Sequence, residues 1–504
     1  MKFRVPLDRN LDIKVFAWSC VLTLPFLIFG GLYPKATGKV ANAVLSNITS
    51  NWDWLYLLSV SLFLLAALII AFSPLGRIKL GGDDERPEFS RISWFSMLFS
   101  AGMGIGLVFW SIAEPMMHFT SPPMGDGGTP EAARMALEIF FFHWGGHAWG
   151  VYVVVGLALA LSQFRQGRPA LISRALAPLF GERLAGGGVG KAIDVLAIWA
   201  TIMGVVTSLG LGALQVVSGF GASIGMPQTG EAKVLVIAGI TLLFIISAVS
   251  GIKRGIKFLS LFNVALMVFI LLYFAGFGPS KYILETFAST LGAYLADLPS
   301  LSFTTKLFGN EGWTRGWTVF YWAWWIAWAP FVGAFIARIS KGRSVREFIL
   351  VVLILPAIFS FIFASTLGGT AFYIDLFEGG KIGALVSSNL EGALFETLRH
   401  LPAFGLLASL ANILIISFFV TSADSATYVI SSFSTEGSSV VDKKLVIFWG
   451  LALGGVAAVL LTAGGLKALQ TASIVGSFPF IIIMWLLLAA TVKELFKDYR
   501  GKSS

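Results

Sequence analysis

Residues 100–106 read Ser-Ala-Gly-Met-Gly-Ile-Gly, inside an apolar run long enough to cross a membrane as a helix. Alternate glycines weaken a helix and let its backbone open, although close packing through small residues would explain them equally well. A second irregular stretch, residues 324–331, contains Pro330, which removes a backbone hydrogen bond and is expected to distort its helix. The two stretches fall in the third and eighth of the apolar runs that we expect. Interrupted helices at corresponding positions of two halves indicate a transporter built from inverted repeats.

Composition places the whole chain in a membrane. Of its 504 residues 56% are hydrophobic and 12% are charged, and the mean hydropathy is +0.82. Soluble proteins carry about a quarter charged residues, so a soluble enzyme, a disordered protein and a fibrous protein are excluded. Long continuous runs favour helices over a barrel, which would show alternating segments of about ten residues.

We expect an all-α integral membrane protein with twelve transmembrane helices in a single domain, 1–504. The expected spans lie near residues 13–33, 52–74, 92–113, 135–163, 191–221, 233–251, 256–278, 316–337, 347–373, 404–435, 445–466 and 469–492. Spans 3–7 and 8–12 would form two inverted five-helix repeats, residues 91–278 and 316–495, preceded by two additional helices within 1–90. Mixed polarity near 281–300 and 380–402 predicts amphipathic helices at the outer surface.

The basic residues predict the orientation. Most of the 36 Lys and Arg fall in segments that share one side if the N-terminus is inside, so both termini are expected to be cytoplasmic. The net charge of +9 then reflects topology and contact with anionic lipid, and no nucleic-acid partner is expected. The single cysteine, Cys20, excludes an intramolecular disulfide.

Two groups of aromatic residues are expected to share helix faces. They are Trp144, Trp149 and Tyr152 beside two glycines in span 4, and Tyr321, Trp324, Trp325 and Trp328 in span 8. An interfacial belt or scattered core aromatics are the alternatives, but both groups lie away from the span ends, where a belt would be. A quaternary ammonium cannot donate hydrogen bonds and is held by the faces of aromatic rings, so the pattern is typical of a cage for such a cation, with no acidic contact required.

Acidic and histidine residues give a weaker signal. Carboxylates at membrane depth are functional candidates, but Glu114 precedes Pro115 near a helix end, where hydration explains it as well. His143 and His147 have the i, i+4 spacing that suits zinc, yet no third ligand is evident, so ordinary hydrogen-bonded residues are expected. Without clustered His, Asp, Glu or Cys, the chain is not expected to be an enzyme.

Four stretches together resemble the betaine/choline/carnitine transporter family. They are residues 102–106 with Glu114 and Pro115, residues 144–152, residues 317–325 running into the basic loop 337–343, and residues 421–425. The resemblance covers essentially the whole chain. It implies a LeuT-type fold, a homotrimer, transport of zwitterionic or cationic compatible solutes across the bacterial plasma membrane, and no organic cofactor.

The resemblance also assigns residues. The family's cage falls on Trp144, Trp149, Tyr152, Trp324, Trp325 and Trp328, followed by Phe331. In sodium-coupled members one ion is held by carbonyls and hydroxyls that match Ser100, Met103, Phe418, Thr421 and Ser422. Hard cations prefer oxygen ligands, which fits this set independently. A second sodium uses two hydroxyls four residues apart; Thr201 matches the first, but Val205 stands at the second, with Thr207 and Ser208 nearby.

Gly106 bears on the substrate, because choline-type, proton-coupled members of the family tend to be acidic at this position. Glycine favours a zwitterion such as glycine betaine. The leading hypothesis is therefore a sodium-coupled importer of betaine-type solutes. A proton-coupled or exchange carrier for choline, carnitine or ectoine is the alternative within transporters. A ligand-gated sensor or channel is the alternative outside them.

Overall fold

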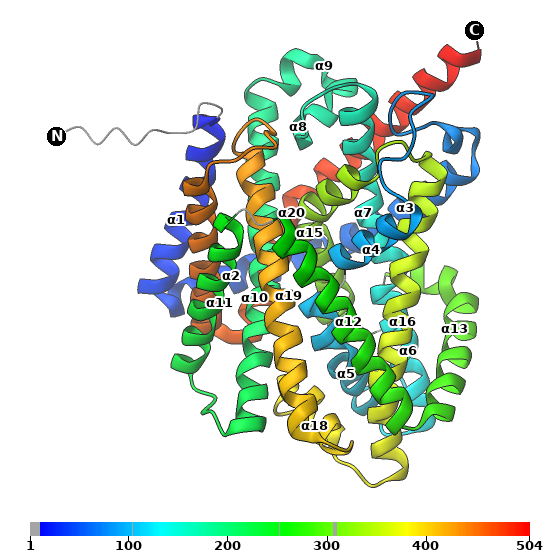
Figure 1. Ribbon diagram of the computed structural model, residues 1–504, viewed down its shortest axis with the longest axis vertical. Coiled ribbons are helices and arrows are strands. Elements are labelled where there is room, and N and C mark those ends of the chain that lie inside the picture. Colours follow the sequence, from blue (N-terminus) through cyan, green and yellow to red (C-terminus); the bar gives the residue numbers. More distant parts are fainter. Residues whose placement is uncertain (1–10, 103, 251–252, 306–309, 504) are drawn as a thin grey trace, which may run out of the picture.

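The computed structural model describes residues 11–102, 104–250, 253–305 and 310–503, and these are almost entirely helical (Figure 1). The helices are α1 Ile13–Leu32, α2 Pro34–Asn51, α3 Asp53–Phe72, η1 Pro74–Arg77, α4 Arg91–Gly102, α5 Ile105–Thr120, α6 Pro130–Trp144, α7 Gly146–Ala160, η2 Leu161–Arg165, α8 Ile172–Ala175, α9 Ala177–Ala185, α10 Gly188–Ile224, α11 Gly230–Ser250, α12 Lys253–Phe277, α13 Ser280–Phe303, α14 Glu311–Gly316, α15 Thr318–Ile339, α16 Val345–Phe377, α17 Ile382–Val386, η4 Leu390–Gly392, α18 Ala393–Arg399, α19 Phe404–Phe433 and α20 Lys443–Ser503. Within the described ranges the only extended pairing is an isolated bridge between Lys79 and Ser344.

Ten helical segments of the described chain are long and apolar enough to cross a membrane. Two features explain why this number differs from the twelve predicted spans. The third predicted span is divided into α4 and α5, each shorter than a membrane crossing. The last two predicted spans are both contained in α20, which bends at Gly465, where φ is 58° and ψ is −138°.

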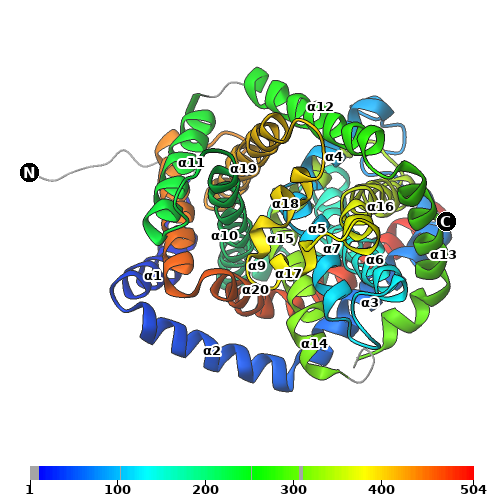
Figure 2. The same ribbon diagram turned by 90° about the horizontal axis from the view of Figure 1, so that it is seen from below.

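Burial separates central from peripheral helices. The most apolar windows of α6–α7 and α10 are 89% buried and that of α14–α15 is 83% buried, whereas those of α1 and α12 are 22% and 28% buried. Figure 2 shows α10 and α15 inside a ring that includes α1, α11, α12 and α13. The peripheral helices expose large apolar side chains such as Phe29, Leu235 and Leu272, which suits contact with lipid.

The helix breaks differ in part from those expected. The opening after residues 100–102 is present, because α4 ends at Gly102 and α5 begins at Ile105. The prediction of an interruption at Pro330 is wrong, since α15 stays helical through this residue. Proline deprives only the carbonyl four residues before it of a partner, and a buried helix tolerates that loss when its neighbours hold it in place.

An unexpected break separates α6 from α7 at Gly145, where φ is −90° and ψ is −144°. A Cβ at this position would lie 2.4 Å from the carbonyl oxygen of Phe141 and 2.7 Å from the hydroxyl of Tyr294, so only glycine fits. Trp144 therefore ends one helix, and Trp149 and Tyr152 belong to the next. The predicted continuous face through all three is replaced by two helix segments.

The helices outside the predicted spans also differ. The predicted helix near 281–300 is present as α13, whereas residues 380–402 form the short pieces α17, η4 and α18. The sequence reading missed α2, which starts with Pro34 at its first position, where the absent N–H costs nothing. Only Ile48 of α2 is buried, so this helix lies on the surface of the bundle (Figure 2).

Candidate functional site

Five aromatic side chains from α6, α7 and α15 meet in what we call the ring cluster: Trp144, Tyr152, Tyr321, Trp324 and Trp325. Trp144 stands edge-on to Trp325, with ring centroids 4.8 Å apart and planes at 75°, and to Trp324 at 6.2 Å and 88°. Trp324 and Trp325 stack at 4.9 Å, and Tyr152 approaches Trp325 at 6.3 Å and 79°. The structure thus brings together four of the seven predicted cage aromatics.

The indole N–H groups of α15 fix the tryptophan orientations. Trp325 donates to the carbonyl of His143 at 2.9 Å, and Trp324 donates to the hydroxyl of Ser208 at 3.2 Å. Trp328 donates to the carbonyl of Gly204 at 2.8 Å. With their polar edges occupied, these rings have only their faces left for a ligand.

The other predicted cage residues lie beside the ring cluster. Trp149 reaches it through Tyr152, with ring centroids 5.4 Å apart. Trp328 and Phe331 pair with each other at 5.6 Å, farther along α15. All three are buried. Whether they contact a ligand stays a prediction.

Gly106 brings α5 against the ring cluster. A Cβ on this residue would lie 2.6 Å from Cη2 of Trp324 and 3.3 Å from Cη2 of Trp144. Real Cβ contacts below 3.0 Å essentially never occur, so any side chain here would displace the rings. The predicted substrate position at Gly106 and the predicted aromatic cage therefore adjoin each other.

A buried carboxylate stands directly behind the ring cluster. One oxygen of Glu114, Oε2, accepts hydrogen bonds from the indole N–H of Trp144 at 3.0 Å and from the hydroxyl of Tyr321. The other, Oε1, pairs with Nδ1 of His143 at 2.6 Å, and His143 Nε2 lies 3.0 Å from the hydroxyl of Thr318. Glu114 is fully buried. Its neighbours make it a hydrogen-bonding centre of the site, and helix-end hydration does not explain it.

The predicted histidine pair is separated. His147 turns to Ser302 at 3.0 Å and stacks on Trp322, while His143 joins Glu114. Both are hydrogen-bonded residues, as expected. His118, which sequence reasoning passed over, is the third member of a group with Glu114 and His143 whose ligand atoms lie within 4.8 Å of one another.

Glu114, His118 and His143 lie close enough together to bind a metal, but their hydrogen bonds argue against it. The donor-only indole N–H of Trp313 lies 3.3 Å from Nδ1 of His118, so that nitrogen is unprotonated. In a neutral imidazole the proton then sits on Nε2, which is 3.6 Å from Glu114. The lone pair that a metal would need is absent from the nitrogen facing the carboxylate. We interpret the group as hydrogen-bonded to the ring cluster, not as a metal site.

Two of the predicted cation ligands, Thr421 and Ser422, lie on α19. Thr421 donates its hydroxyl to the carbonyls of Ser417 and Phe418, both at 3.1 Å. Ser422 lies beside the break between α4 and α5, because a Cβ on Gly104 would come 3.6 Å from its hydroxyl. Met103 falls outside the described residues, and so does the side chain of Ser100, whose backbone belongs to α4. The hydroxyl of Ser422 therefore lies close to the break, and the cation site stays a prediction.

The second predicted cation position is less complete. Thr201 donates to the carbonyl of Ala197 at 2.8 Å, and Val205, one turn later, is buried and apolar. Thr207 contacts Ser473 at 2.8 Å and so joins α10 to α20. Since Ser208 accepts from Trp324, both nearby hydroxyls already have partners.

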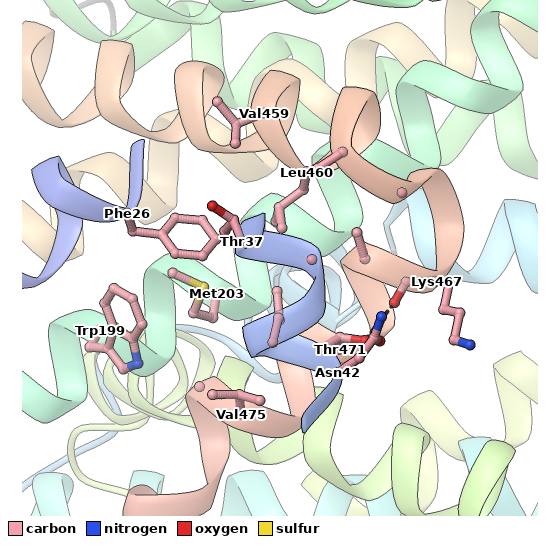
Figure 3. Close-up of a pocket in the computed structure, with 17 residues that line it drawn as sticks. Phe26, Thr37, Asn42, Trp199, Met203, Val459, Leu460, Lys467, Thr471 and Val475 are labelled. Carbon is pink, nitrogen blue, oxygen red and sulfur yellow. Dashed lines mark hydrogen bonds between the residues drawn. The ribbon is translucent and has the colours of Figure 1, made fainter. Parts of the chain in front are cut away.

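A separate pocket of about 130 Å³ lies under α2, among α1, α10 and α20 (Figure 3). Its lining includes Phe26, Trp199 and Met203, with Thr37 and Lys467 among its few polar residues. None of its lining residues belongs to the ring cluster. The candidate site is therefore the ring cluster with Glu114 and not this peripheral hollow.

Comparison with known proteins identifies the family of this chain. Residues 14–500 match the model of the BCCT, betaine/carnitine/choline family transporter. The chain belongs to this family. It is 46% identical to a probable glycine betaine transporter of Desulfitobacterium hafniense (strain Y51), over 98% of this chain and 99% of the relative. It is 43% identical to the glycine betaine transporter OpuD of Bacillus subtilis (strain 168), over 97% and 95%. It is 42% identical to an ectoine/hydroxyectoine transporter of Virgibacillus pantothenticus, over 97% of both.

Membership of the betaine/carnitine/choline family makes this chain a multi-pass membrane protein of the transporter class. The family resemblance predicted the tryptophan-rich α15, and the structure shows which of its rings face α6 and α7. The role of Glu114 was not predictable by that route. The available signal was a carboxylate within an apolar span, which identifies a candidate but not its partners.

Proposed function

We propose that this protein is a secondary active transporter that imports betaine-type quaternary ammonium solutes and couples their entry to sodium. The observation that carries the proposal is the ring cluster, in which Trp144 and Trp325 stand edge to face at 4.8 Å beside the side-chain-free Gly106. A trimethylammonium group has a diffuse charge and no N–H donor, so ring faces bind it better than hydrogen-bond acceptors do.

Sodium coupling is supported by the oxygen groups near the helix break. The hydroxyl of Ser422 lies beside Gly104 at the break, and Thr421 precedes it on α19. Na⁺ is a hard cation that takes such oxygen ligands. We further propose twelve spans in two inverted five-helix repeats, with α20 contributing two spans. The protein would be a homotrimer in the bacterial plasma membrane, with both termini cytoplasmic and no enzymatic activity.

The second candidate is a proton-coupled or exchange carrier for choline, carnitine or ectoine. It is favoured by the relatives, which include the ectoine/hydroxyectoine transporter and, at 36% identity, an osmo-dependent choline transporter of Acinetobacter baylyi. For the sodium-coupled candidate, the buried apolar Val205 at the second cation position favours one sodium per cycle over two.

Uptake by purified protein in liposomes tests both candidates. Labelled glycine betaine, choline, carnitine and ectoine are offered under an inward sodium gradient, under a proton gradient alone, and with unlabelled substrate inside. We expect betaine uptake only with sodium. Betaine accumulation that is equally fast in sodium-free buffer would reject the coupling, and no betaine uptake under any condition would reject the substrate.

A further inference from the structure

The carboxylate of Glu114 touches the ring cluster on the side away from the faces that a ligand would use. It contacts the polar edge of Trp144, through the indole N–H, and the hydroxyl end of Tyr321. The far sides of these rings pack toward Trp325, at centroid distances of 4.8 Å and 5.9 Å. A ligand held among the rings is therefore separated from Glu114 by the width of about one ring.

We assign Glu114 as ionised and His143 as neutral with its proton on Nδ1, which gives an acceptor to each of the three donors within hydrogen-bond distance of Glu114. Trp144 is a donor only, and a carboxylate that accepts from it, from Tyr321 and from the Nδ1–H of a neutral His143 uses both oxygens as acceptors. His118 is neutral, because its Nδ1 accepts from Trp313. In this assignment the hydroxyl of Thr318 donates to Nε2 of His143, and the group carries one net negative charge.

We propose that Glu114 determines specificity from behind the ring cluster, where it fixes Trp144 and Tyr321 and supplies a counter-charge that no ligand touches. This inference rests on the proposed function. A cation among the rings feels the charge across one ring, while the carboxylate of a zwitterion can point away from it. The field therefore favours net cations over zwitterions and orients a zwitterion with its ammonium toward Trp144.

Glu114→Gln tests the charge with little change in shape. Glutamine can accept from Trp144 and Tyr321 with its oxygen. Its amide can donate to Nδ1 of His143 if that ring moves its proton to Nε2 and donates to Thr318 instead. With an effective dielectric constant of about 20 and about 7 Å between the carboxylate and the bound ammonium, loss of the unit charge weakens cation binding roughly fiftyfold. Binding of a zwitterion weakens only roughly fivefold, because the repulsion of its distant carboxylate by Glu114 is lost as well.

The experiment measures binding of choline and glycine betaine to the purified full-length protein by tryptophan fluorescence, for the parent, Glu114→Gln, Glu114→Asp and Tyr321→Phe. We expect Glu114→Gln to weaken choline about tenfold more than betaine. Glu114→Asp, which keeps the charge but shortens its reach, and Tyr321→Phe, which removes one donor, should weaken both ligands by similar factors.

Equal losses for both ligands in Glu114→Gln would overturn the inference, since they would mean that Glu114 only holds the rings or is balanced by a charged His143. If Glu114→Gln does not fold, Glu114→Asp decides, because a changed choline-to-betaine ratio in a variant that keeps the charge contradicts the proposal. A parent protein that binds neither ligand overturns the proposed function, and this inference with it. A parent that binds both, with the ratio kept in Glu114→Gln, overturns the inference alone.

Discussion

Replacing Gly106 with alanine should weaken substrate binding by deforming the ring cluster. The added methyl carbon would lie 2.6 Å from Cη2 of Trp324 and 3.3 Å from Cη2 of Trp144. Because two carbon atoms pack best at about 3.5–4.0 Å, the Trp324 ring has to move by about 1 Å. It cannot move freely, since it stacks on Trp325 at 4.9 Å and its N–H donates to Ser208 at 3.2 Å.

Overpacking of this kind costs about 1–3 kcal/mol, so we expect the affinity for betaine to fall about 5- to 150-fold. Tryptophan fluorescence titration in detergent measures the change. Gly369→Ala in α16 is the matched control, because a Cβ there meets nothing within 4 Å and binding should be unchanged. Parent-like affinity in Gly106→Ala would refute the reasoning. Gly106→Asp would test whether an acidic side chain here favours choline, but it introduces the same clash. A gain of choline binding in Gly106→Asp therefore supports an effect of charge only if Gly106→Asn, which adds similar volume without charge, shows no such gain.

Three further predictions follow from single contacts. Trp325→Leu removes a ring face and the Trp325 N–H bond, and should weaken betaine binding roughly tenfold while the protein still folds; an unchanged titration excludes this ring from the site. The pair Thr421→Ala and Ser422→Ala deletes two hydroxyls near the helix break and should raise the sodium concentration needed for half-maximal uptake, whereas an unaltered sodium dependence would contradict the assignment. Burial opposes ionisation of Asp12, but Lys191 at 2.7 Å and the backbone N–H groups at the start of α1 outweigh it and lower its pKa. Because the folded-state pKa is lowered, Asp12→Asn should reduce the free energy of unfolding by about 1 kcal/mol between pH 8 and pH 5, and by less below about pH 4. Thermal unfolding measures this difference. A destabilisation that grows on acidification would contradict the prediction.

The sequence predicted the parts of the fold that depend on hydrophobicity alone. Apolar runs located the membrane helices, because hydrocarbon requires about twenty apolar residues whatever the neighbours are. The same criterion missed α2, because its polar and small residues resemble those of a loop. The one local signal for this helix is Pro34 at its first position. Hydrophobicity also could not decide between breakage and continuity at Pro330, because the outcome depends on how the neighbouring helices hold α15.

The sequence predicted which residue types form the site, but not the hydrogen bonds that connect them. The tryptophans of spans 4 and 8 indicated a cage, and the family resemblance supplied their positions. The bonds that join Glu114 to His143 and to Tyr321 connect residues 29 and 207 positions apart in the chain. Such contacts arise from the packing of α5 against α6 and α15, and no local pattern around residue 114 encodes them. The need for glycine at the break also depends partly on a distant contact, because a Cβ on Gly145 would lie 2.7 Å from the hydroxyl of Tyr294 on α13.

Gly106 and Glu114 belong to the same helix, α5, and this places two electrostatic features along one axis. Eight residues at 1.5 Å each separate them by about 12 Å, with the break before Ile105 at one end and the carboxylate toward the other. The first N–H groups of a helix and its dipole favour a negative charge at the N-terminus, while Glu114 favours a positive one among the rings that it touches. A zwitterion lying along α5 with its ammonium toward Trp144 satisfies both at once, and the reversed orientation satisfies neither. A cation gains from Glu114 alone. In this proposal the site still selects by charge although position 106 carries no acidic side chain, because the carboxylate of Glu114 stands behind the rings. From there it favours one orientation of a zwitterion and does not meet the carboxylate of the substrate at contact distance.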